Sequence, residues 1–180
     1  MFDKKPPAGL KEPCELSEFI IRAVLIGVGA TAVLDLWAQF AKRALAIPGP
    51  NWNMVGRWIG HFPQGRLVHE NMTLASPVRG ERAIGWSAHY AIGVVFAGLL
   101  LAIAGLDWAR HPTLPPALIC GVLTVAAPFL VMQPGMGAGI AASKTPNPNL
   151  ARRRSLLAHT VFGLGLYVAA WATALLVPTS

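Results

Sequence analysis

Four apolar segments, each long enough to cross a lipid bilayer as a helix, restrict the fold of this chain more than any other feature of its sequence. A hydrocarbon core about 30 Å thick requires roughly 20 residues of helix. Backbone polar groups find no partner in hydrocarbon, which favours helices for runs of this length. The sequence therefore predicts an all-α fold, a four-helix transmembrane bundle. Its helices are expected over about residues 19–41, 84–106, 117–133 and 156–177.

Composition supports a membrane protein. Of the 180 residues, 54% are hydrophobic and only 13% are charged, whereas roughly 25% of the residues of a soluble domain are charged. The first expected partner is therefore the lipid bilayer, with one transmembrane domain over residues 18–180. The leader over residues 1–17 is polar, and its several carboxylates suit a cleaved signal peptide poorly, so the first apolar segment is expected to be a retained anchor.

The connection over residues 51–82 carries apolar side chains at positions 54, 55, 58, 59 and 62. This spacing is helical and predicts a short helix in the membrane interface; the alternative is an irregular loop packed on the bundle. In the third segment Pro128 predicts a kink, because proline lacks the amide hydrogen of the helical ladder.

The formal net charge of +7 does not indicate nucleic-acid binding, because the basic residues flank the apolar segments. Ten of the 15 Lys and Arg residues fall in the connections between segments one and two and between segments three and four. The positive-inside rule then places both long loops in the cytoplasm and both termini in the periplasm. The predicted location is the inner membrane of a bacterial cell.

Ionisable residues inside apolar segments mark candidate functional sites, because burying them in lipid is expensive. At 1.5 Å of rise per residue, Asp35, His89 and His159 lie about 10, 8 and 5 Å from the loop ends of their helices. They predict one polar pocket near the cytoplasmic face, covered by the first long loop, with the opposite half of the bundle nearly pure aliphatic. The candidate pocket residues are Asp35, Gln39, His69, Glu70, His89, Tyr90, Met132, Gln133 and His159.

Three interpretations of this layer stay open. The side chains can serve helix packing through interhelical hydrogen bonds. His89 and His159, with Asp35, can bind a metal ion or act as axial ligands of a haem. The same residues can instead line a path for a substrate or for protons. The sequence has no Cys-x-x-Cys-His motif, which excludes a covalently attached c-type haem.

Several motifs resemble an uncharacterised family of small bacterial inner-membrane proteins, domain of unknown function 2938, over about residues 20–177. The resemblance implies a helical protein with several membrane spans and supplies no activity, cofactor or catalytic residue. The motifs are Gly85-Trp86-Ser87-Ala88-His89-Tyr90, Met132-Gln133-Pro134-Gly135-Met136-Gly137, Thr145-Pro146-Asn147-Pro148, and His159-Thr160-Val161-Phe162-Gly163-Leu164-Gly165-Leu166-Tyr167.

The expected function is that of a non-catalytic accessory or structural subunit of a larger membrane-protein complex. The sequence lacks the Gly-x-Ser-x-Gly and His-Glu-x-x-His signatures and a paired-carboxylate pattern, so no enzyme is expected. The first alternative is a transporter of a small molecule, an ion or protons. The second is a haem- or metal-binding membrane protein that uses His89 and His159.

Overall fold

The computed structural model describes residues 13–177 and contains no strand within them, which confirms the all-α fold. The long helices are α1 (Pro13–Ala44), α3 (Glu81–Arg110) and α6 (Pro148–Leu176). The shorter ones are α2 (Trp52–Gly60), α4 (Leu114–Leu123) and α5 (Gln133–Gly135). Single turns complete the chain: η1 (Phe62–Gln64), η2 (Met72–Leu74), η3 (Pro128–Met132) and η4 (Ile140–Ala142).

The long helices extend beyond their predicted bounds. Helix α6 begins eight residues before the predicted start, because the Asn147 side chain accepts a hydrogen bond from Leu150 N at 3.2 Å and Pro148 occupies the first turn. Helix α3 kinks at Gly105 and continues to Arg110. Helix α1 starts at Pro13, so the last five residues of the predicted leader are helical; the first twelve lie outside the described residues.

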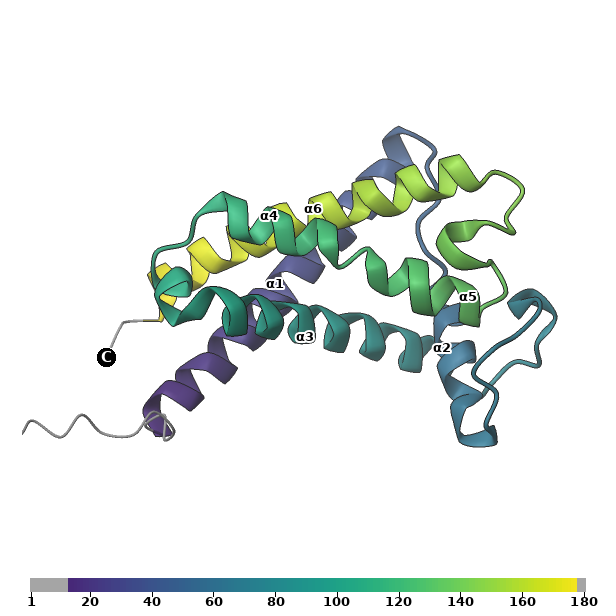
Figure 1. Cartoon of the computed structure of the whole chain (residues 1–180), viewed down its shortest axis with the longest axis horizontal. Coiled ribbons are helices and arrows are strands. Elements are labelled where there is room, and N and C mark those ends of the chain that lie inside the picture. The colour runs from purple at the N-terminus through teal and green to yellow at the C-terminus, as the bar shows by residue number, and fades with distance from the viewer. Residues whose placement is uncertain (1–12, 178–180) are drawn as a thin grey trace, which may run out of the picture.

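The third apolar segment is broken near Pro128, as its sequence predicts. The α-helical ladder of α4 ends at Leu123, with turn-like bonds from Val125 N to Val122 O and from Ala127 N to Thr124 O. A wider π-type turn follows in η3, where Gln133 N bonds to Pro128 O. In Figure 1 this break lets the chain run obliquely, from beside α6 at α4 toward α2 at α5.

The core lies where α1 packs against both α3 and α6, while α4 packs against α6. Fully buried residues at these contacts are mostly small or aliphatic, which lets the helix backbones approach closely. They include Ile26, Ala30, Leu101, Leu166 and Ala170. Helix α2 and the loops around it lie at one end of the bundle, here called the α2 end (Figure 1). Helix α1 begins and α6 ends at the opposite end.

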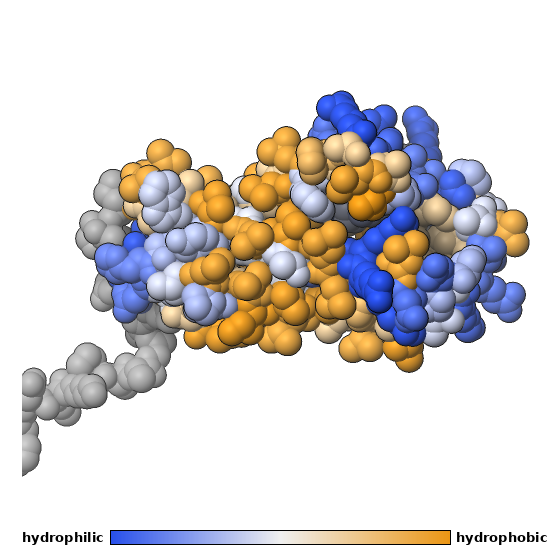
Figure 2. Space-filling model, turned by 90° about the horizontal axis from the view of Figure 1, so that it is seen from above, coloured by the Kyte–Doolittle hydropathy of each residue, from blue (hydrophilic) through white to orange (hydrophobic). Residues whose placement is uncertain are grey.

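Four helical spans among the described residues are long and apolar enough to cross a membrane: residues 15–44, 81–110, 114–135 and 148–176. Their outer faces expose large apolar side chains, including Ile103, Leu123 and Leu175. Figure 2 shows apolar atoms across the middle of the molecule, with hydrophilic atoms gathered most strongly at the α2 end. This distribution suggests a membrane protein, because such an apolar band matches hydrocarbon and the polar ends match water.

The end opposite α2 is not the nearly aliphatic region that the sequence predicts. The Arg22 side chain is 0% exposed and donates to Glu18 Oε1 at 2.8 Å, Ala109 O at 3.3 Å and Val177 O at 3.0 Å. Arg110 also donates to Glu18 Oε2, at 2.7 Å. The expectation fails because α1 begins before Glu18 and α3 continues to Arg110, so both extensions bring charged partners beside Arg22.

The helix expected in the first long loop is α2, and it packs across the start of α3. Two glycines make this crossing possible: a Cβ on Gly56 would lie 1.7 Å from Glu81 O, and one on Gly85 would lie 1.9 Å from Trp52 O. Arg57 forms two hydrogen bonds to the Glu81 carboxylate, at 2.8 and 3.0 Å. These bonds raise the pKa of the Arg57 guanidinium, so the pair stays charged and fixes α2 on α3.

Candidate functional site

Asp35 is the centre of a polar cluster between α1 and α3. Its Oδ1 lies 2.9 Å from His89 Nε2, and its Oδ2 accepts a hydrogen bond from the Tyr90 hydroxyl at 3.0 Å. Both side chains of the pair are largely buried, with exposures of 15% for Asp35 and 8% for His89. A carboxylate only accepts, so the His89 hydrogen sits on Nε2. The cluster therefore satisfies both carboxylate oxygens inside the protein.

Aromatic rings from α2 and α3 hold the His89 imidazole in place. The Trp52 ring stacks on it with centroids 3.9 Å apart and planes at 25°. Trp86 contacts it edge-on, with centroids 5.9 Å apart. The Gly56–Gly85 crossing brings Trp52 to this position, so the orientation of His89 depends on the seating of α2.

His159 on α6 is held by α4 rather than by Asp35. Its Nδ1 lies 3.0 Å from Thr124 Oγ1 and 3.3 Å from Gly121 O, and the Thr124 hydroxyl donates to Gly121 O at 2.6 Å. Because a carbonyl oxygen only accepts, these contacts place the hydrogen on Nδ1. Nε2 of the neutral ring is then a hydrogen-bond acceptor, and none of the described residues donates to it.

A cavity of about 560 Å³ lies among α1, α2, α3, η3 and α6 and includes this layer in its wall. Asp35, His89, Met132 and His159 all line it, so four of the predicted pocket residues share one cavity. Most of the wall is apolar and much of that is aromatic. The aromatic side chains are Trp37, Trp52, Trp58, Phe96 and Phe162.

Arg154 lines the same cavity and was not among the predicted site residues. Its Nε is buried and has no hydrogen-bond partner among the described residues. The sequence shows it only as one of three consecutive arginines before an apolar segment, which is typical of a topology signal. The early start of α6 is what places it in the helix, five residues before His159, while its neighbour Arg153 is exposed.

The remaining residues of the predicted layer lie beside the cavity or away from it. Tyr90 does not line the cavity, but its hydroxyl donates a hydrogen bond to Asp35, which does. The Gln133 amide donates to Ser155 Oγ at 3.4 Å, and its Oε1 is buried without a partner among the described residues. Gln39 is exposed and does not line the cavity; the partners of Asp35 are His89 and Tyr90.

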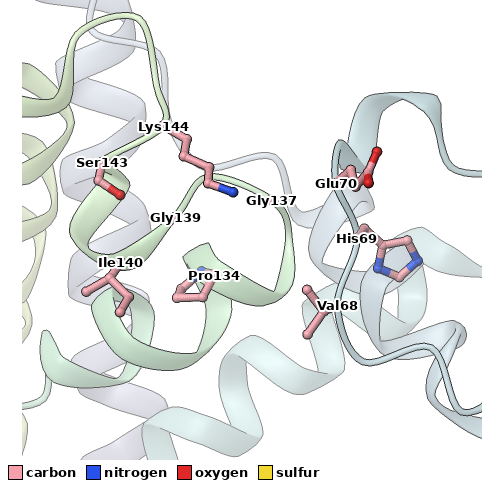
Figure 3. Close-up of a pocket in the computed structure, with 9 residues that line it drawn as sticks. All are labelled: Val68, His69, Glu70, Pro134, Gly137, Gly139, Ile140, Ser143 and Lys144. Carbon is pink, nitrogen blue, oxygen red and sulfur yellow. The ribbon is translucent and has the colours of Figure 1, made fainter.

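His69 and Glu70 do not cover this cavity, and the predicted shared pocket is wrong for them. They line a second cavity of about 460 Å³, between residues 68–70 and the segment from Pro134 to Lys144 (Figure 3). Backbone hydrogen bonds hold the loop at this position; His69 N donates to Gly135 O at 2.8 Å. The His69 ring lies against His61, their Nε2 and Nδ1 atoms 3.0 Å apart.

The metal and haem interpretations depend on which side-chain atoms are free to act as ligands. Within residues 13–177 no three His, Cys, Asp or Glu side chains are grouped so that they could hold a metal ion. His89 uses Nε2 for Asp35, and His159 uses Nδ1 for Thr124. Each ring therefore keeps one nitrogen for a further ligand.

A model of one protein family covers both the cluster and the cavity wall. It matches residues 24–173 and carries the description "Protein of unknown function (DUF2938)". No curated protein and no solved structure matches the chain. The match spans most of α1 and α6 and all of α3, which confirms the resemblance found in the sequence motifs. The chain therefore belongs to the DUF2938 family.

Proposed function

We propose that this protein is an integral membrane protein that binds an amphipathic small molecule in the cavity between α1, α3 and α6. The observation that carries the proposal is one cavity of about 560 Å³ with mainly apolar walls and a few fixed polar groups. Sites for small molecules in proteins have this character and typically measure about 300–1,000 Å³.

The polar groups of the wall support binding rather than simple packing. Asp35 and His89 are held in one geometry by partners inside the protein, whereas the buried Arg154 Nε has none among the described residues. Polar atoms left without partners in a largely apolar space are costly. A bound molecule with its own polar group would satisfy them.

The wider role stays a prediction. A cavity ligand is compatible with the accessory or structural subunit expected from the sequence and with the transporter alternative, and it favours neither. In the haem alternative, the two histidines would bind through His89 Nδ1 and His159 Nε2. Visible absorption and metal analysis of the purified protein separate this alternative from the other two, because only a haem or a coloured metal centre absorbs there.

The proposed location is the inner membrane of a bacterial cell, with the α2 end in the cytoplasm. Basic residues are concentrated in the two long loops, and the positive-inside rule assigns such loops to the cytoplasm. Reporter fusions within the loops near Arg66 and Lys144 should therefore report a cytoplasmic position, and a fusion after Ser180 a periplasmic one. A cytoplasmic reporter signal from the fusion after Ser180 would contradict this orientation.

Filling the cavity should abolish ligand retention. Ala158 lines the cavity on α6, one residue before His159, and the Ala158→Trp side chain would occupy space that the ligand needs. We expect native mass spectrometry of the full chain, released from a neutral detergent, to show a stoichiometric small-molecule adduct that Ala158→Trp loses.

The matched control is Ala172→Trp, which places the same side chain at an exposed position of the same helix. It should keep the adduct, because its indole faces away from the cavity. The proposal fails if the unchanged protein carries no adduct, or if Ala158→Trp folds and carries the same adduct in the same amount.

A further inference from the structure

The proposed function leaves open which polar group the ligand carries. We infer that the cavity takes an amphiphile with an anionic head, a carboxylate or a phosphate, bound at Arg154, and an apolar chain directed toward Phe162. This inference rests on the proposed function and adds the chemical class of the ligand.

The charges of the cavity wall favour an anion. The wall carries one carboxylate, Asp35, and one guanidinium, Arg154. The two oxygens of Asp35 accept hydrogen bonds from His89 and Tyr90. Arg154 forms neither an ion pair nor a hydrogen bond with any of the described residues, and its Nε is buried. The unpaired charge of the wall is therefore that of a cation, and a guanidinium matches carboxylate and phosphate oxygens best.

Ser155 offers a second donor beside Arg154. Its Oγ accepts from the Gln133 amide at 3.4 Å, which leaves the hydroxyl hydrogen free to donate to an anion. Both residues line the cavity from the same turn of α6. His159 stands about 8 Å further along the helix axis by its rise, and its Nε2 is an acceptor when the ring is neutral. An anionic head is therefore placed at Arg154 rather than at His159.

The rest of the wall suits an apolar chain. From Arg154 to Phe162 the lining of α6 extends about 12 Å along the helix axis. Beyond Asp35 and His89, the cavity wall includes Phe96, Gly93 and Thr31. The Thr31 hydroxyl adds no free donor, because it already donates to Gly27 O at 2.8 Å. Arg154 lies near the start of α6, at the polar α2 end, so the ligand would have its head toward that end and its chain in the apolar band (Figure 2).

The test uses the full chain in neutral dodecyl maltoside micelles and four twelve-carbon probes: dodecanoate, dodecyl phosphate, dodecanol and dodecyltrimethylammonium. Isothermal titration, corrected by titration into empty micelles, gives the Kd of each. Dodecanoate or dodecyl phosphate should bind about tenfold or more tightly than dodecanol, as expected for one charge-assisted hydrogen bond. A preference for dodecanoate assigns the site to free fatty acids, and a preference for dodecyl phosphate assigns it to lipid phosphates.

Arg154→Gln should remove this preference, Arg154→Lys should keep part of it, and Arg153→Gln should leave it unchanged, because Arg153 is exposed and outside the cavity wall. Equal binding of dodecanol, or tighter binding of the cationic probe, overturns the inference. So does an unchanged preference in Arg154→Gln. If dodecanol binds as well as the anions and Ala158→Trp abolishes both, the proposed function stands without this inference. If no probe binds, both fail.

Discussion

Replacing Gly85 by alanine should strongly destabilise the protein. The new Cβ would lie 1.9 Å from Trp52 O, a backbone atom that cannot move without shifting α2. Overpacking of this kind costs about 2 kcal/mol. Separating α2 from α3 also removes the Trp52 ring from His89, so thermal unfolding and binding of the cavity ligand should be impaired together.

The control is Gly98→Ala, on the same helix. A Cβ at that position would have one neighbour within 4 Å, Ala23 Cβ at 4.0 Å, which is an ordinary contact. Alanine is also the better helix former, by roughly 1 kcal/mol. Gly98→Ala should therefore leave the melting temperature unchanged or raise it. Equal stability of Gly85→Ala and Gly98→Ala would show that α2 does not seat against α3 as described.

Replacing Arg22 by methionine should also cause a large loss of stability. The methionine fills similar space but removes the donors to Glu18, Ala109 O and Val177 O, which tie α1 to the ends of α3 and α6. Breaking a buried ion pair of this kind costs about 3 kcal/mol. Denaturant titration of the full chain in mild detergent should show a correspondingly lower free energy of unfolding.

Arg153→Met serves as the comparison, because it removes an exposed arginine from the same chain. Its free energy of unfolding should change by less than about 0.5 kcal/mol, as for most surface substitutions. Ligand binding is expected to survive Arg22→Met under conditions where the protein is still folded, because Arg22 lies at the end opposite the cavity. If Arg22→Met is as stable as Arg153→Met, the hydrogen bonds of Arg22 do not stabilise the fold as described.

The helical fold and the approach of Asp35 to His89 could be expected from the sequence alone. Hydrophobic length defines the spans, and a fixed rise per residue places Asp35 and His89 near one level. Their contact at 2.9 Å fits that prediction. The kink at Pro128 is equally local, because it follows from the missing amide hydrogen of proline and the clash of its ring with the preceding turn.

What the sequence does not predict depends on contacts between distant segments. Trp52 stacks on His89 because two glycines let α2 cross α3, which no periodicity reveals. His69 was assigned to the wrong cavity because its position is fixed by a backbone bond to Gly135. Arg154 was taken as a topology signal because the start of α6 is set by capping at Asn147, a boundary that hydropathy does not mark.

The most direct test of the account is an electron-density map of the full chain crystallised from a lipidic mesophase, without added ligand. The account predicts elongated density in the cavity, with one end within hydrogen-bonding distance of Arg154 and the other beside Phe162, and with the Asp35–His89 contact intact. It would be contradicted by α1, α3 and α6 closing on one another with no cavity between them, or by a cavity that holds only ordered water.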